Sequence, residues 1–150
     1  MSAPSEPQWV IHVDGASLGN PGPAGIGAWC TDAQGRVVAQ LSKHLGETTN
    51  NVAEYLALVY ALQYARQRGI ERVLVRTDSE LMARQLNGEY KVRDGTLRLL
   101  YDLASTLRDT FASCGVQHVR REFNTGADRL AGQGAKARFD PALKIVAGGD

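Results

Sequence analysis

Cysteine is scarce in this sequence, and the positions of the two cysteines argue against both a disulfide framework and a metal cluster. Cys30 and Cys114 lie far apart and show no metal-ligand spacing, so we expect two reduced thiols rather than a bridge. Reduced thiols are typical of a cytoplasmic protein, and we expect that location. The first residues, MSAPSEP, show neither a basic start nor an apolar core, so no export signal is expected.

Long apolar runs and a dominant charge are also missing. No run approaches the length of a membrane span, so we expect no membrane partner. The net charge is +1, and this overall balance does not by itself indicate a nucleic-acid partner. Local groups of cations at 91–93, 120–121 and on the last predicted helix are equally consistent with an ordinary solvated surface.

A phosphate-binding glycine loop is absent, although the stretch VDGASLGNPGPAG at residues 13–25 is rich in glycine and proline. No helix follows these glycines and no Lys-Ser/Thr pair completes a P-loop. The stretch is instead typical of a turn between two strands, with an acid, Asp14, at its start.

What is present fits one globular domain. The chain has 150 residues, of which 43% are hydrophobic and 22% charged, and this length can bury a core of its own. We expect a single domain over residues 1–150, with its core at about 8–138 and a loosely attached C-terminal tail at 139–150. Nothing indicates a dimer interface, so a monomer is the default expectation.

Apolar periodicity predicts an α/β fold. Strands are predicted at 8–14, 25–32, 37–45, 72–78 and 116–120, and helices at 51–68, 79–86, 97–111 and 125–138. Short connections between the first three strands favour an antiparallel meander. The first strand–helix–strand unit should cross over right-handed, which places the fourth strand parallel to an earlier one.

Four carboxylates stand at the ends of these predicted elements: Asp14, Glu54, Asp78 and Asp128. Each has a structural explanation of its own. Glu54 and Asp128 both lie three residues after a potential helix cap, the spacing of a capping box. Asp78 has the position of a helix cap, and Asp14 that of a turn residue before a glycine.

Considered together, the four acids indicate a metal site. If the first and fourth strands are neighbours, Asp14 and Asp78 reach the same sheet edge, where open α/β sheets bind ligands. Several acids at one half-buried place repel each other unless cations neutralise them, and Mg²⁺ or Mn²⁺ prefers such oxygen ligands. Two such ions can promote phosphodiester hydrolysis. The scattered histidines His12, His44 and His118 are predicted to be strand residues rather than zinc ligands.

Four segments resemble, in order, the signature segments of type 1 ribonuclease H: VDGASLGNPGPAGIGA, TNNVAEYLAL, VRTDSELMARQLNGEYKV and VRREFNTGADRLAGQGA. The likeness runs from about Ile11 to Ala137. It implies a ribonuclease H-like five-stranded mixed sheet, three strands antiparallel and two parallel, flanked by helices. It also implies an endonuclease that uses two Mg²⁺ ions, or Mn²⁺ as a substitute, to hydrolyse the RNA strand of RNA–DNA hybrids. The implied products carry a 5′ phosphate and a 3′ hydroxyl.

The resemblance also assigns residues. It implies that Asp14, Glu54, Asp78 and Asp128 are the catalytic, metal-binding acids. The implied contacts to the hybrid are Gly15, Asn20, Thr49, Asn50, Asn51, Arg120 and Arg121. Amide side chains both donate and accept hydrogen bonds, which suits base edges and the 2′-hydroxyls that distinguish RNA from DNA.

The sequence departs from many bacterial members of this family in three places. The loop before Asp128 has no histidine, so we expect Arg120 or Arg121 to contact the phosphate or product instead. The basic insertion between the middle helices is missing, and Lys91 and Arg93 would supply a reduced version with weaker hybrid affinity and a shallow salt dependence. Glu80 stands where an amide is common, and its role stays open.

Two other functions remain compatible with the sequence. One is a related nuclease that also cuts RNA–RNA duplexes, because a shared fold does not determine the substrate. The other is a hybrid-binding module without catalysis, against which the presence of all four acids argues.

Overall fold

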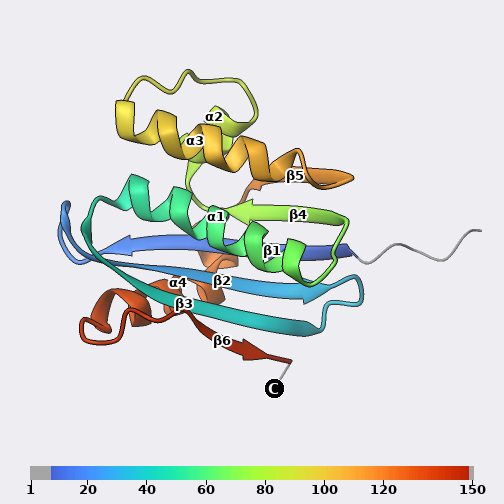
Figure 1. The fold of residues 1–150 in the computed structure, drawn as a ribbon, viewed down its shortest axis with the longest axis horizontal. Coiled ribbons are helices and arrows are strands. Elements are labelled where there is room, and N and C mark those ends of the chain that lie inside the picture. The colour runs from blue at the N-terminus through green and yellow to red at the C-terminus, as the bar shows by residue number, and fades with distance from the viewer. Residues whose placement is uncertain (1–7, 149–150) are drawn as a thin grey trace, which may run out of the picture.

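A mixed six-stranded sheet organises the molecule (Figure 1). The computed structural model describes residues 8–148. The strands are β1 (Gln8–Ser17), β2 (Gly22–Asp32), β3 (Val37–Thr48), β4 (Arg72–Thr77), β5 (Ser113–His118) and β6 (Lys144–Ala147). The helices are α1 (Asn50–Gln67), α2 (Glu80–Leu86), α3 (Gly95–Arg108) and α4 (Thr125–Lys136), with a 3₁₀ turn, η1, at Arg121–Phe123.

The strand order is β5-β4-β1-β2-β3-β6. Strands β1, β2 and β3 form the expected antiparallel meander, and β4 and β5 continue the sheet parallel to β1. The prediction of a mixed α/β fold with three antiparallel and two parallel strands is therefore confirmed for these five strands. The pairing of β1 with β4 aligns Val13 with Thr77, so the next residues, Asp14 within β1 and Asp78 just after β4, are neighbours.

The sheet has one strand more than expected, because part of the predicted tail joins it. Strand β6 pairs antiparallel with β3, from Ala39 opposite Ala147 to Ser42 opposite Lys144. A loosely attached tail is thus wrong for these residues. The four residues of β6 are all exposed, so no buried alternating pattern marked them as a strand. Their pairing comes from the free edge of β3, which a sequence pattern does not show.

The observed ends of α3 and β5 differ from the predicted ones, and local contacts explain the difference. Helix α3 begins at Gly95, two residues earlier than predicted, because the Asp94 carboxylate accepts a hydrogen bond from the Leu97 amide at 2.9 Å and caps the helix. Strand β5 begins at Ser113 rather than at 116, since its pairing with β4 starts there. The predicted end of β5 at Arg120 was too late, and the following 3₁₀ turn was not predicted.

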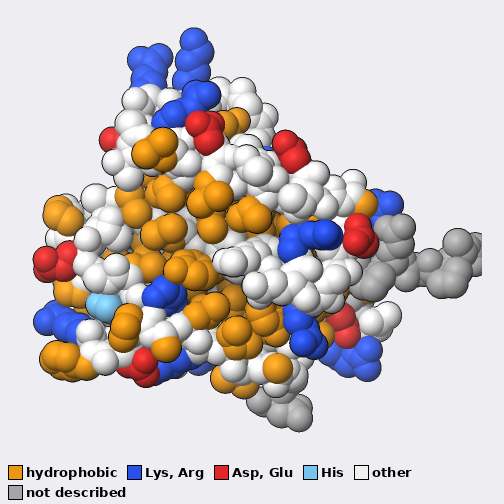
Figure 2. Space-filling model, in the orientation of Figure 1, with side chains coloured by type: hydrophobic (Ala, Val, Ile, Leu, Met, Phe, Trp, Pro, Cys, Tyr) orange, Lys and Arg blue, Asp and Glu red, His pale blue; other side chains and the backbone are white. Residues whose placement is uncertain are grey.

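Helices cover both faces of the sheet, and α1 fills most of one face (Figure 1). Its buried side packs on strand residues that are fully buried, such as Ile11, Val13 and Ile26. The outer side of α1 is also apolar: Leu56 and Tyr60 are half-buried there. Figure 2 shows hydrophobic side chains gathered on this surface, over α1 and towards α3. Within residues 8–148, no helix is both long and apolar enough to span a membrane.

The two cysteines are free, as predicted. Cys30 lies fully buried in β2, and burial raises the pKa of its thiol to about 12. Cys114 is half-buried at the start of β5.

Two glycines allow the helices to approach the sheet beside Asp14. A Cβ atom on Gly15 would lie 2.3 Å from the carbonyl carbon of Ala53 in α1. A Cβ atom on Gly27, which pairs with Asp14, would lie 2.3 Å from the carbonyl oxygen of Ala127 in α4. The backbone of α4 therefore contacts the sheet at Gly27, opposite Asp14, and the backbone of α1 contacts it at Gly15, the next residue. Any side chain at these positions would push a helix away.

We predict that Gly27→Ala lowers the free energy of unfolding by about 1–3 kcal/mol, because the clashing atoms belong to the backbone and cannot rotate aside. The matched control is Gly132→Ala in the same helix–sheet layer, where a Cβ atom meets nothing within 4 Å. This control should be neutral or slightly stabilising. Urea unfolding followed by circular dichroism measures both, and equal midpoints for the two variants would contradict the prediction.

Candidate active site

Four carboxylates line a single open cavity of about 480 Å³ at the sheet edge where β1 and β4 end. Asp14 comes from β1, Glu54 from α1, Asp78 from the residue after β4, and Asp128 from α4. The other residues that line the cavity are Gly15, Ala16, Ser17, Asn50 and Arg121. The structure thus brings all four acids together from four separate elements.

The capping explanations for Glu54 and Asp78 do not hold. Thr49 is the N-cap of α1, and its hydroxyl accepts a hydrogen bond from the amide of Val52 at 3.3 Å, so Glu54 lies beyond the capping-box position. Helix α2 is capped by Ser79, not by Asp78. Neither carboxylate is needed to complete a helix end.

The structural explanations for the other two acids fail as well. Asp14 lies inside β1, paired with Gly27, and is not a turn residue. Helix α4 begins at Thr125 after Asn124, so the expected capping box between Thr125 and Asp128 does not form. All four acids are therefore left without a local structural function.

Burial and mutual repulsion shift the ionisation of these acids. Asp14 is 6% exposed, and its pKa is raised to about 9, first by burial and then by the charge of Asp78. A hydrogen bond to Asp128, the charge of Asp128 and that of Glu54 raise it further. Burial is also the main cause that raises the pKa of Glu54 to about 6, while a hydrogen bond from Ser79 acts in the opposite direction.

The pKa of Asp78 is also raised by burial, but a nearby positive charge acts against this shift. Burial raises its pKa, and the nearby Arg121 guanidinium is the largest effect in the opposite direction. The Nη2 atom of Arg121 also lies 3.6 Å from Oδ1 of Asp128. One exposed arginine cannot neutralise the carboxylates, so the cavity keeps an unbalanced negative charge that favours a cation.

The four carboxylates that line the cavity offer only oxygen atoms as acidic ligands, and hard divalent cations such as Mg²⁺ prefer oxygen ligands. As placed, the oxygens do not form a closed ligand set: within residues 8–148 no three acidic, histidine or cysteine side chains are grouped so that they would hold an ion. Repulsion among the carboxylates favours such a spread arrangement. His12, His44 and His118 lie in β1, β3 and β5, as predicted, and none of them lines the cavity, although the charge of His118 lowers the pKa of Asp78.

The predicted substrate contacts divide into two groups. Gly15, Asn50 and Arg121 line the carboxylate cavity, whereas Asn20, Thr49, Asn51 and Arg120 do not. Asn20 and Asn50 are nevertheless linked, because the amide of Asn50 donates to Oδ1 of Asn20 at 3.0 Å. Oδ1 of Asn50 accepts from the amide of Ser17 at 2.9 Å. These bonds join the β1–β2 turn to the start of α1 and form one polar rim beside the acids.

The two candidate arginines differ in their surroundings. Arg121 points to the acids, as its contact with Asp128 shows. Arg120 instead pairs with Glu122 at 3.6 Å and lies outside the lining of the cavity. The geometry favours Arg121.

Two supporting residues were missed by the sequence analysis. Ser79 caps α2 and also donates to the Glu54 carboxylate, although its sequence position indicated only the start of a helix. Asn124 is 1% exposed, and its Nδ2 donates to the carbonyl oxygen of Val13 at 3.0 Å, which ties the start of α4 to β1 next to Asp14. No local pattern distinguishes such a long-range bond.

Comparison with known proteins agrees with this geometry. Residues 12–134 match the family model described as reverse transcriptase-like. Ribonuclease HI of Halobacterium salinarum is 39% identical over 81% of this chain and 61% of its own length. The crystal structure of RNase H1 from the same archaeon superimposes with a TM-score of 0.83 at 38% identity, covering 85% of this chain and 96% of that one. The chain belongs to the type 1 ribonuclease H family.

Further relatives of this family extend the comparison. A bifunctional protein of Mycobacterium tuberculosis is 43% identical over 92% of this chain. The crystal structure of LC11-RNase H1 in complex with an RNA/DNA hybrid has a TM-score of 0.83 and 38% identity, covering 88% of this chain and 99% of that one. This chain spans 40% of the length of the mycobacterial protein and 61% of the Halobacterium ribonuclease HI.

We predict that Asp14→Asn stabilises the protein in EDTA at neutral pH by about 1–3 kcal/mol, since it removes a carboxylate that folding forces into a buried, negative site. The folded pKa of about 9 lies above the ordinary 3.8, so the stability that protonated Asp14 contributes is complete below 3.8 and is lost as the pH rises towards 9. The advantage of the variant should therefore shrink as the pH falls towards 3.8.

Urea unfolding between these two pH values measures the effect. The control is Asp102→Asn on α3, whose side chain is 58% exposed and which should change stability little at any pH. A destabilised Asp14→Asn at neutral pH would contradict the expected repulsion.

Proposed function

We propose that this chain is an endoribonuclease that hydrolyses the RNA strand of RNA–DNA hybrids with the help of two divalent cations. The observation that carries the proposal is the convergence of Asp14, Glu54, Asp78 and Asp128 on one cavity without a structural function. Membership of the type 1 ribonuclease H family and the hybrid bound to a relative with 38% identity support the same activity.

In this proposal the four carboxylates hold two Mg²⁺ ions, or Mn²⁺ in their place. Such ions, when bound, lower the pKa of a water and stabilise the charge on a leaving oxygen. The chain itself contributes the fixed positions of the ligands: the backbone of β1 holds Asp14, and the Ser79 hydroxyl holds the Glu54 carboxylate. The proposed products carry a 5′ phosphate and a 3′ hydroxyl.

The polar rim is proposed to recognise the RNA strand. Gly15 has no side chain, so a nucleic-acid backbone can approach Asp14 closely. Asn20, Thr49, Asn50 and Asn51 surround the start of α1, where amide and hydroxyl groups can pair with 2′-hydroxyls and phosphates. The hydrogen bonds of Asn20 and Asn50 to backbone groups orient this rim before substrate arrives.

The activity is tested with labelled RNA–DNA, RNA–RNA and DNA–DNA duplexes in Mg²⁺, Mn²⁺ or EDTA. We expect cleavage of the RNA strand of the hybrid alone, abolished by EDTA and by Asp14→Asn, with a 5′ phosphate on the downstream fragment. Cleavage of RNA–RNA would instead support the broader nuclease. Hybrid binding without cleavage would support the non-catalytic module.

We further predict that Arg121→Ala lowers the turnover of the hybrid about tenfold or more, because Arg121 is the cation nearest to Asp78 and Asp128 and is positioned to contact a phosphate. The matched control is Arg120→Ala, which removes the same charge from the neighbouring position and should change turnover less than twofold. Single-turnover and steady-state cleavage rates separate chemistry from product release. Full turnover in the Arg121 variant would exclude this role.

A further inference from the structure

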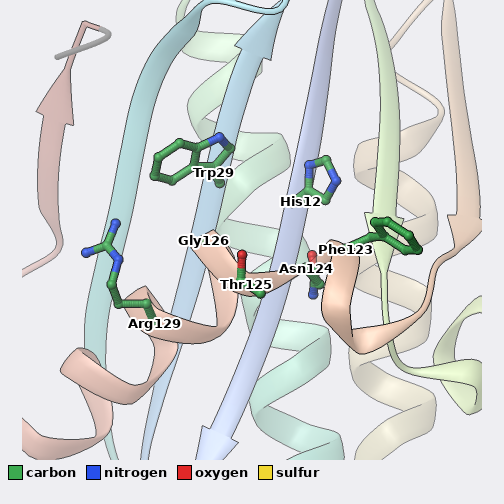
Figure 3. A pocket seen from close by; sticks show the side chains of 7 residues that line it. All are labelled: His12, Trp29, Phe123, Asn124, Thr125, Gly126 and Arg129. Atoms are coloured by element: carbon green, nitrogen blue, oxygen red, sulfur yellow. The ribbon is translucent and has the colours of Figure 1, made fainter.

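A second cavity lies on the α4 face of the sheet, away from the carboxylates. It has a volume of about 470 Å³ and is lined by His12, Trp29, Phe123, Asn124, Thr125, Gly126 and Arg129 (Figure 3). None of these residues lines the carboxylate cavity. Its described lining contains an arginine but no acid, so its electrostatic character is opposite to that of the carboxylate site.

Aromatic rings form two of its walls. Trp29 projects from β2 and Phe123 from the 3₁₀ turn before α4, and Figure 3 shows them on opposite sides of His12. Phe123 is 66% exposed, which is unusual for a large apolar side chain and leaves its ring available. Rings at the mouth and wall of a cavity are suited to a flat, aromatic ligand.

The start of α4 offers a binding place for an anion beside these rings. Asn124 is the N-cap residue, but its side chain makes no capping bond and is turned to the Val13 carbonyl oxygen instead. The first-turn amides of α4 therefore lack the side-chain acceptor that usually satisfies them. Because Thr125 and Gly126 line the cavity, this positive helix end faces it.

Arg129 adds a full positive charge one turn further along α4. Its guanidinium lies over the Trp29 ring, 5.9 Å from the centroid, and donates to Oε1 of Gln40 at 3.3 Å. A guanidinium has five N–H donors, so these two contacts leave donors for a phosphate.

Two polar atoms in the cavity wall have unmet hydrogen-bonding capacity. Asn124 is 1% exposed, yet its Oδ1 has no hydrogen-bond partner within residues 8–148, and the same is true of Nδ1 of His12. Buried polar atoms without partners are rare and costly in proteins. Figure 3 shows both side chains at the centre of the cavity, between the two aromatic rings.

We propose that this cavity binds a nucleoside monophosphate. The base lies against Phe123 and Trp29, and the phosphate occupies the start of α4 beside Arg129. The ligand is either a free nucleotide or the terminal nucleotide of a strand, because both present the same chemistry. The site is separate from the proposed hydrolytic centre and does not depend on that activity.

Binding is measured by isothermal titration calorimetry in EDTA, which suppresses binding through cations at the carboxylates. The probes are AMP, adenosine, inorganic phosphate and a short 5′-phosphorylated single strand. We expect AMP to bind with a dissociation constant below about 1 mM, and adenosine and phosphate to bind at least about fivefold more weakly. Quenching of Trp29 fluorescence in a Trp9→Phe background locates the ligand, since Trp9 is buried and stacked on Tyr64.

Phe123→Ala and Arg129→Gln should each weaken AMP binding about fivefold or more. The matched controls are Phe139→Ala, which truncates a fully exposed phenylalanine, and Arg138→Gln, which lies two residues beyond the end of α4; neither should change binding. Asp14→Asn should bind AMP as the unmodified chain does, so failure of hydrolysis and failure of this site are distinguishable.

Saturable binding of AMP would identify a free nucleotide as the ligand, and binding of the phosphorylated strand alone would identify a strand end; both support the site. The proposal is overturned if neither probe binds, or if Phe123→Ala and Arg129→Gln leave the affinity unchanged. It is also overturned if inorganic phosphate binds as tightly as AMP, or if Asp14→Asn removes AMP binding.

Discussion

Repulsion among four carboxylates at one sheet edge is the constraint that the rest of the structure has to withstand. Burial and neighbouring charges raise the pKa of Asp14 to about 9, so the fold holds this group against its preference for water. Contacts made elsewhere must supply the stability that the site removes. The buried core between α1 and strands β1 and β2 supplies such contacts on one face of the sheet, and the packing of α4 on β1, β2 and β3 supplies them on the other.

Close backbone contacts and one buried side-chain hydrogen bond hold the acids in place. Gly15 admits α1 next to Asp14, and Gly27 admits α4 on the opposite face of the sheet. Asn124 then bonds the start of α4 to β1. Because Asp14 lies in β1 and the helices that carry Glu54 and Asp128 contact β1, the backbone limits how far these carboxylates can separate to relieve their repulsion. Protonation of Asp14 and a bound cation are two ways to lower the energy of the site.

The sequence predicted the elements well, and it also predicted that the four acids lie together, because both leave local marks. Apolar periodicity located the five strands of the central sheet and all four helices, and acids at element ends located the cavity. What it missed depends on distant partners. Strand β6 exists through the free edge of β3, and the role of Asn124 exists through a bond to Val13, 111 residues away. Such contacts follow from the assembled sheet and not from a window of sequence.

The bond between Asn124 and Val13 also influences both cavities. By donating to the Val13 carbonyl instead of capping α4, Asn124 fixes the helix that carries Asp128 and leaves the positive end of that helix uncapped. One consequence is an acidic cavity suited to cations, and the other is a neighbouring cavity with a positive rim and aromatic walls. A residue that capped α4 conventionally would satisfy the helix but lose the tie to β1. The choice between these two bonds couples the position of the fourth acid to the character of the second cavity.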